Sequence, residues 1–344
     1  MNNRSHTMPT FSTLAITLLM FFGLHAAVDL ASAEEAFHSG GFARAPEGAL
    51  DIANAPAPLF RDPVTNGAAD PSVVWNAKEK AWYVFYTQRR ANAALPPAES
   101  WYMGTKIAIA KSADQGRSWN YVGTAQGLSR GLKEETFWAP HVFEDNGTWH
   151  LFVTFIPKVV KSAKGQPEIC HYTSRDLVKW EYSDTVDVKS DDIIDPGVVK
   201  LRDGRWLMVF RDCRQQNRTA KVVSTDLKNW QRLEDLTGSG AHEAPVVLFW
   251  KNKFWMFIDE WKGIGVYESD DGIKYTQNNL ILDKAGKRAD DGYWGSHPVW
   301  HLPVTARLFS TMSMPVARSA STPRPWIRRA LNSNGPACRW RRSS

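Results

Sequence analysis

Residues 194–199 read Ile-Asp-Pro-Gly-Val-Val: a carboxylate, a Pro-Gly turn and a run of β-branched residues. Residues 69–74, Ala-Asp-Pro-Ser-Val-Val, have the same order. Residues 242–247, His-Glu-Ala-Pro-Val-Val, repeat it with the acid one position earlier, and residues 138–143, Trp-Ala-Pro-His-Val-Phe, repeat it without an acid. A turn followed by β-branched residues favours a strand. The four copies therefore indicate an internal repeat whose units each open with a strand.

Each copy is followed by two further apolar runs, a turn of the Ser-x-Asp type and a closing aromatic residue. The closing aromatics, at positions 119, 180, 230 and 275, lie 61, 50 and 45 residues apart. A period of about 50 residues that holds about four short strands is typical of a β-propeller blade. We predict an all-β fold, a five-bladed β-propeller, whose fifth blade opens at residues 290–298 and is incomplete.

Composition divides the chain into four segments. Residues 1–33 have a basic start, an apolar run and a small-x-small cleavage site, which is typical of a secretory signal peptide. The apolar run is too short for a comfortable membrane span. Residues 34–60 are an extended lead-in, and residues 61–298 form the propeller. We expect a secreted or periplasmic protein with no membrane contact after cleavage.

Residues 299–344 depart from the blade pattern. From residue 301 onward the chain has eight Arg and no acidic residue, and without these arginines the formal charge of +6 becomes −2. The body of the protein is therefore not basic, and nucleic-acid binding is not expected. We hypothesise that the reading frame shifts near residue 298, so that the tail replaces the true fifth blade; a genuine basic tail is the alternative.

Three carboxylates open the first strands of three blades. The first strands of a propeller line its central channel, so Asp70, Asp195 and Glu243 should converge there. Like charges that converge repel each other. Asp-Pro is also a common turn opener, but three acids in register favour a catalytic function over turn capping.

Four further residues are candidates for the same channel. Trp138 and His141 open the second blade, where the Trp either stacks on a sugar ring or packs in the core. Arg211 ends the second strand of the third blade, where it either binds ligand hydroxyls or holds a carboxylate. His297 aligns with the aspartates of the two Asp-Pro motifs, so a ligand-binding or cation-linked role stands beside a structural one.

Two features stay open between alternatives. Three cysteines give no disulfide framework. Cys170 and Cys213 fall in neighbouring blades, where they either pair or, as we expect, are two buried free thiols. The long connection at residues 88–103 is either a pocket wall or an insertion.

In this order and spacing, the motifs resemble those of the family 43 glycoside hydrolases, five-bladed propellers that act on arabinan- and xylan-type glycans. The resemblance covers roughly residues 69–297. It implies that Asp70 is the general base, that Asp195 tunes and orients the acid, and that Glu243 is the general acid. It also implies a structural calcium or other cation in the channel beside His297. The chain departs from the family where Ala follows the Glu in place of the common Gly.

The resemblance implies an inverting glycoside hydrolase, and the predicted signal peptide implies that it is exported. Its substrates would be arabinose-, xylose- or galactose-containing oligosaccharides or polysaccharides of plants or algae, and it would act as a monomer with no required cofactor. Inversion needs one protonated and one ionised carboxyl, roughly 6.5–9.5 Å apart. The third carboxylate would raise the pKa of the acid.

Two other functions compete with hydrolysis by an inverting mechanism. A non-catalytic carbohydrate-binding propeller is one, and the presence of all three acids counts against it. A sialidase is the other, because residues 112–119 resemble the Asp box of that class. A sialidase needs an arginine cluster and a Tyr nucleophile, whereas the strand openings here carry carboxylates, Trp and His.

Overall fold

The computed structural model describes residues 58–91, 102–132, 135–157, 167–236, 241–285, 294–301 and 307–311. These residues form strands and turns, and none of them lies in a helix long and apolar enough to cross a membrane. The predicted signal peptide, most of the lead-in and residues 312–344 lie outside them.

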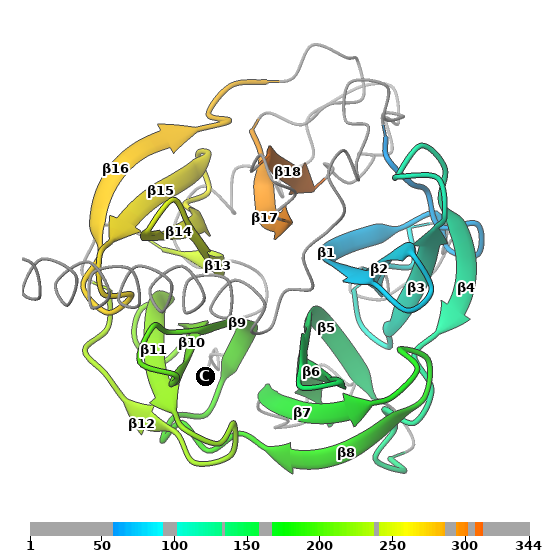
Figure 1. Cartoon of the computed structure of the whole chain (residues 1–344), viewed down its shortest axis with the longest axis horizontal. Coiled ribbons are helices and arrows are strands. Elements are labelled where there is room, and N and C mark those ends of the chain that lie inside the picture. Colours follow the sequence, from blue (N-terminus) through cyan, green and yellow to red (C-terminus); the bar gives the residue numbers. More distant parts are fainter. Residues whose placement is uncertain are drawn as a thin grey trace, which may run out of the picture. The chain divides into compact units, whose positions relative to one another are not determined.

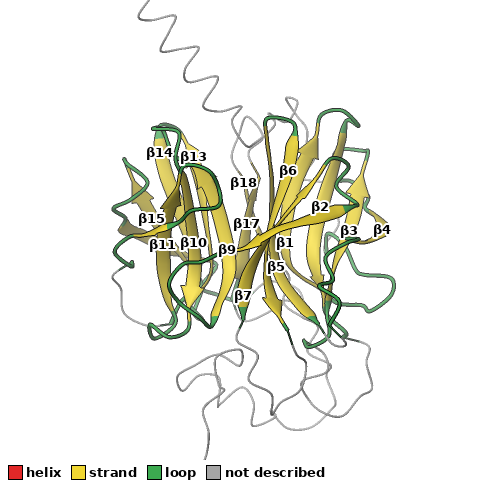
Figure 2. Cartoon of the chain, turned by 90° about the horizontal axis from the view of Figure 1, so that it is seen from below, coloured by secondary structure: helices red, strands yellow, loops and turns green. Residues whose placement is uncertain are grey.

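Four sheets have four antiparallel strands each, and a fifth has two. The sheets are arranged about a common centre (Figure 1), and loops join the strands at both ends (Figure 2). The strands of the five blades, in order, are β1 (Ala68–Asn76), β2 (Ala81–Gln88), β3 (Lys106–Ser112) and β4 (Asn120–Thr124); β5 (Thr136–Asp145), β6 (Thr148–Ile156), β7 (Glu168–Ser174) and β8 (Trp180–Thr185); β9 (Ile193–Lys200), β10 (Trp206–Asp212), β11 (Arg218–Ser224) and β12 (Gln231–Arg232); β13 (Glu243–Trp250), β14 (Lys253–Asp259), β15 (Ile264–Ser269) and β16 (Thr276–Ile281); and β17 (Ser296–His301) and β18 (Arg307–Thr311).

The five inner strands form a ring. β1 contacts β5, β5 contacts β9, β9 contacts β13, β13 contacts β17, and β17 contacts β1. The predicted all-β, five-bladed propeller is confirmed. The described residues give the fifth blade two strands, and the boundary predicted at residue 298 falls inside β17. The reading-frame hypothesis for residues 299–344 stays a hypothesis.

The same distortion opens every inner strand. The residue before each motif proline has a positive φ, and the ladder to the second strand shifts register there. A bulge of this kind re-aims side chains, and the left-handed conformation is unfavourable for residues other than Gly. The repeated motif therefore specifies a strained bulge that turns one residue per blade toward the centre: Asp70 (φ 51°), Ala139 (47°), Asp195 (60°), Ala244 (45°) and His297 (45°).

The blades pack face to face, which buries their middle strands on both sides. Every residue of β2 and of β10 is buried. Each strand therefore begins with a continuous apolar run instead of alternating, and only its last two residues are polar. A side chain could not replace Gly197 of the Asp-Pro-Gly motif, since its Cβ would lie 2.6 Å from the carbonyl oxygen of Pro245. The glycine allows β9 and β13 to approach each other.

The Ser-x-Asp turns are structural. The Ser112 hydroxyl donates to the Asp114 carboxylate at 2.7 Å, and the same pair recurs at Ser224 with Asp226 and at Ser269 with Asp271, both at 2.9 Å. Each turn joins the third strand of its blade to the fourth.

The two cysteines in neighbouring blades do not pair. Cys170 is buried and free. Cys213 is disulfide-bonded, so the expectation of two free thiols is wrong for Cys213.

Asp62 fastens the residues before β1 to the first blade. It is 2% exposed, and its carboxylate accepts hydrogen bonds from the Tyr86 hydroxyl at 2.6 Å and the Gln88 amide at 2.9 Å. Asp62→Ala leaves both buried donors without this acceptor. We expect the variant to lose about 3 kcal/mol in the free energy of unfolding, measured in urea. The exposed Asp203→Ala serves as control; an equal, small change in both variants would contradict this role.

Candidate active site

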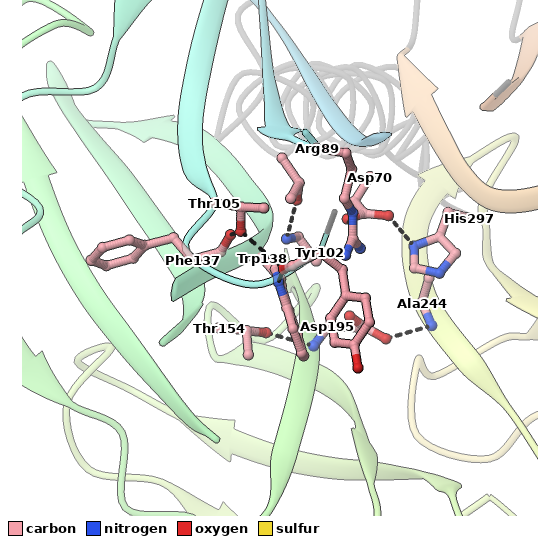
Figure 3. A network of polar contacts seen from close by, with 12 residues as sticks. Asp70, Arg89, Tyr102, Thr105, Phe137, Trp138, Thr154, Asp195, Ala244 and His297 are labelled. Carbon is pink, nitrogen blue, oxygen red and sulfur yellow. Dashed lines mark hydrogen bonds and ion pairs between the residues drawn. The ribbon is translucent and has the colours of Figure 1, made fainter. Parts of the chain in front are cut away.

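The structure brings the three predicted carboxylates and His297 together. Figure 3 shows Asp70, Asp195 and His297 from close by. His297 Nδ1 lies 2.9 Å from Asp70 Oδ1, and its Nε2 lies 3.4 Å from Glu243 Oε2. Asp195, Glu243 and His297 each have one polar atom within 4.8 Å of the others. The imidazole ring therefore stands between Asp70 and Glu243, with Asp195 beside them.

Two arginines, one partly and one fully buried, pair with Asp70 and Glu243. Arg89 Nη2 lies 2.8 Å from Asp70 Oδ2. Arg211 is fully buried and its Nη1 forms an ion pair with Glu243 Oε1. Of the two roles considered for Arg211, the structure shows the one that holds a carboxylate. Arg89 was not among the predicted residues, because no repeated motif marks its position.

One position in the second strand of each blade connects that blade to the next. The position lies five residues after the aromatic residue that is near the start of the second strand: Trp82, Trp149, Trp206 or Phe254. Its side chain faces the bulge that opens the first strand of the next blade. The Thr87 hydroxyl accepts a hydrogen bond from the backbone N–H of Ala139 at 2.9 Å. We call the four residues at this position the latch residues: Thr87, Thr154, Arg211 and Asp259.

The latch residues differ in what they can accept. Thr154 accepts from the backbone N–H of Asp195 at 3.0 Å, and Asp259 accepts from that of His297. Arg211 has no acceptor, so the N–H of Ala244 donates instead to Asp195 Oδ2 at 3.2 Å. Arg211 at this latch position therefore forms an ion pair with Glu243. Asp195 takes over the hydrogen bond to the next bulge that the latch residue makes in the other blades.

These contacts determine the protonation states of Asp70 and His297. Burial alone would raise the pKa of Asp70, but the charges of Arg89 and His297 hold it below its ordinary value. Burial alone would lower the pKa of His297, but Asp70 and Glu243 raise it well above 6.5. Asp70 is therefore a carboxylate and His297 an imidazolium near neutral pH.

The pKa values of Asp195 and Glu243 differ from the sequence-based expectation, in which Asp195 raises the pKa of Glu243. Burial, together with the negative charges of Glu243 and Asp70, raises the pKa of Asp195 to about 6. Burial would raise the pKa of Glu243 as well, but Arg211 and His297 lower it. Below a pH of about 6, Asp195 therefore holds the proton in preference to Glu243, because the buried arginine lowers the pKa of Glu243.

Asp259 is a fourth carboxylate that the motifs did not reveal. It is 1% exposed and pairs with Glu243 in the β13–β14 register. Burial raises its pKa to about 6. Its carboxylate accepts from the N–H of Trp261 at 2.8 Å and from that of His297, so it positions the fifth blade's histidine.

The predicted cation site can be compared with the residues around His297. Calcium takes about six to eight oxygen ligands. The cluster found among the described residues offers two carboxylates and one imidazole, and both nitrogens of that imidazole already face Asp70 and Glu243. These residues supply few of the oxygen ligands that calcium takes, and the cation beside His297 stays a prediction. The His297 imidazolium supplies a positive charge between the carboxylates.

Trp138 is buried and His141 is partly buried. Trp138 is 5% exposed, donates its indole N–H to the carbonyl oxygen of Tyr102 at 2.7 Å, and has the Arg89 guanidinium 5.6 Å from its ring centroid. His141 Nε2 donates to the carbonyl oxygen of Val198 at 2.9 Å. Burial lowers the pKa of His141 to about 4. The uncharged side chain of His141 therefore links β5 to β9 through this hydrogen bond.

Residues 60–232, about half of the chain, match the protein family described as glycosyl hydrolases family 43. The chain belongs to this family. As a family 43 member, it is a glycosidase that hydrolyses O-glycosyl compounds. The family match includes Asp70 and Asp195 and ends before Glu243 and His297, whose place in the site comes from the geometry above.

Solved structures share the fold of this family 43 chain. One is a family 43 β-xylosidase/α-arabinofuranosidase from a compost microbial metagenome in complex with xylotriose, with 14% identity, a TM-score of 0.55, and coverage of 70% of this chain and 83% of that chain. An endo-arabinase from Bacteroides thetaiotaomicron has 18% identity, a TM-score of 0.50, and coverage of 75% and 94%. A family 117 glycoside hydrolase from Zobellia galactanivorans has 14% identity, a TM-score of 0.52, and coverage of 64% and 72%. No curated protein sequence matches the chain.

Proposed function

We propose that this family 43 protein is an exported, inverting glycosidase that acts on arabinose-, xylose- or galactose-containing glycans. The observation that carries the proposal is the placement of Asp70 and Glu243 on opposite sides of the His297 ring. An intervening imidazole keeps the two carboxyls apart, as a mechanism with a water between base and sugar requires. Asp70, held ionised by Arg89, takes a proton from this water, and Glu243 protonates the departing oxygen.

The acid of this mechanism, Glu243, needs a proton, and below a pH of about 6 Asp195 holds it. Asp195 and Glu243 interact strongly, so they lose their last shared proton in one macroscopic step. A glycosidic oxygen at Glu243 accepts a hydrogen bond only from a protonated carboxyl, and it therefore favours the state with the proton on Glu243. Asp195 therefore holds the proton that Glu243 gives to the departing oxygen.

The pH dependence follows from these charges. The Asp195–Glu243 pair holds its proton below a pKa of about 6 and loses it above, whereas Asp70 stays ionised down to more acidic pH. We expect kcat/KM to be steady between about pH 4.5 and 5.5 and to fall roughly tenfold per pH unit above about pH 6.5. A profile measured with one aryl glycoside checks this; constant kcat/KM from pH 6 to 8 would contradict it.

The proposed substrates follow the family and two neighbours in fold. The compost metagenome enzyme is a β-xylosidase/α-arabinofuranosidase with bound xylotriose, and the Bacteroides protein is an endo-arabinase. Both names refer to pentose glycans, so we propose substrates of this kind for the present chain. Purified protein should be screened on aryl arabinofuranoside, xyloside and galactoside. Hydrolysis of at least one is expected.

The screen also separates the proposal from a sugar-binding propeller without activity. Binding of xylo- or arabino-oligosaccharides without hydrolysis of any glycoside would favour the binding protein. We further propose that the mature protein is a monomer and is exported after removal of residues 1–33. N-terminal sequencing of the exported protein should begin at Glu34; retention of residues 1–33 would contradict export by cleavage.

A further inference from the structure

Each latch residue has a partner directly opposite it, on the third strand of the same blade. Three of these partners are isoleucines: Ile107 opposite Thr87, Ile169 opposite Thr154 and Ile264 opposite Asp259. The partner of Arg211 is Thr219. A hydroxyl therefore replaces an apolar side chain in the blade whose latch residue is a cation.

The following blade has a matching position two residues before its bulge. At three interfaces the backbone N–H of this position donates to an equivalent carbonyl oxygen of the preceding blade: Phe137 to Thr105 at 3.1 Å, Ile193 to Pro167 at 3.2 Å and His242 to Asn217 at 2.8 Å. The first two interfaces are apolar, because Ile107 and Phe137 belong to one hydrophobic cluster and Ile169 and Ile193 to another. The interface of the third and fourth blades has Thr219 and His242 in their place.

Thr219 and His242 contact each other beside the catalytic acid. The Thr219 hydroxyl lies 3.2 Å from His242 Nδ1, and the two residues are 0% and 1% exposed. Residues that pair directly across two strands share a face of the sheet, so Thr219 lies beside Arg211 on the face that meets Glu243. Two consecutive residues of the fourth blade thus contact two paired residues of the third.

This buried group has hydrogen-bonding capacity that the described residues do not use. Arg211 Nη1 donates to Glu243, whereas Arg211 Nε and Nη2 have no acceptor in the described part of the chain. His242 Nε2 has no partner there either. A buried charged group without hydrogen bonds is unfavourable, and a buried water commonly satisfies such groups where two or more polar atoms surround it.

We propose that His242 and Thr219 are positioning residues of the catalytic acid, which hold Arg211 against Glu243 through a buried water. This inference rests on the acid role of Glu243 in the proposed function. His242 and Thr219 act through Arg211, which in turn holds one oxygen of the Glu243 carboxyl. A guanidinium that lacks the water turns toward other acceptors and moves this carboxyl away from the departing oxygen.

Thr219 determines which nitrogen of His242 can accept a hydrogen bond from the water. Burial lowers the pKa of His242, so its ring is uncharged near neutral pH and has one donor and one acceptor nitrogen. With the proton on Nδ1, the ring donates to the Thr219 hydroxyl and Nε2 is the acceptor. The water then donates to His242 Nε2 and accepts from Arg211.

The kinetic test is the leaving-group dependence of kcat/KM in two shape-preserving variants. Thr219→Val removes the hydroxyl, and His242→Phe removes both ring nitrogens. We expect each variant to lose about tenfold or more on an unactivated oligosaccharide and about threefold or less on an activated aryl glycoside, because the poor leaving group depends more on the acid. A role in blade packing alone would lower both rates equally.

Two conservative variants and one control accompany this test. Thr219→Ser keeps the hydroxyl, and His242→Gln keeps an acceptor near the position of Nε2, so both should retain the leaving-group dependence of the parent. Ile169→Val changes the equivalent position of the second blade and should leave both rates unchanged. Thermal unfolding shows whether each variant is folded.

A crystal structure of the full chain tests the water without any turnover. We expect an ordered water within about 3 Å of His242 Nε2 and of Arg211 Nε or Nη2. Absence of this water, or an unchanged leaving-group dependence in both Thr219→Val and His242→Phe, would overturn the proposal. A failed aryl-glycoside screen with the water present would refute the hydrolase function, while the link from His242 to Arg211 would stand.

Discussion

Asp70→Asn should lower kcat by about 10²–10⁴-fold on every glycoside, whatever its leaving group. The amide keeps the size of the side chain and still accepts a hydrogen bond from Arg89, but it cannot take a proton from water. The loss is uniform because water activation is required for each substrate. Initial rates on an activated aryl glycoside and on an unactivated oligosaccharide measure it.

A matched control is Asp203→Asn, since Asp203 is exposed and pairs with Arg205 on a surface turn. We expect normal rates for this variant. Asp70 is 8% exposed, so both proteins should be compared by thermal unfolding first. Near-normal activity of a folded Asp70→Asn variant would exclude this residue as the base.

Glu243→Gln should affect substrates unequally. A poor leaving group requires protonation as it departs, so its hydrolysis should fall by about 10²–10⁴-fold, whereas an activated aryl group should lose much less. The measurement is kcat/KM across aryl glycosides of increasing leaving-group pKa, where the variant should show a steeper dependence than the parent.

The control for this series is Glu268→Gln, which changes a carboxyl that faces Lys253 on the surface. Its leaving-group dependence should equal that of the parent. The Glu243 variant also leaves the buried Arg211 without its counter-charge, and we expect some loss of stability. Losses of the same size for good and poor leaving groups would contradict the acid role of Glu243.

The repeat predicted the blades because each carries the same turn chemistry. Asp70, Asp195 and His297 precede a proline in three blades, and all three have the same left-handed backbone conformation in the structure. The alignment of Trp138 with Glu243, each two residues before a proline, also holds, because both precede the bulge residue of their strand. Local motifs of this kind can be read from one sequence.

The sequence left the role of Arg211 open and did not predict Asp259 or Arg89, although these residues set charges in the site. Asp259 and Arg211 occupy the same latch position as Thr87 and Thr154, and four copies with three residue types form no visible motif. Arg89 follows the end of β2, in a place without a repeated signal. The expectation that Asp195 raises the pKa of Glu243 failed for the same reason, since the depressed pKa depends on Arg211 and His297, which meet Glu243 only in the folded ring.

The central claim is that Asp70 and Glu243 act in a single displacement through water. Proton NMR of the first product, recorded within minutes of adding enzyme and before mutarotation, tests it most directly. The account predicts that the newly formed reducing sugar has the anomeric configuration opposite to that of the substrate. A first product with the configuration of the substrate would contradict it.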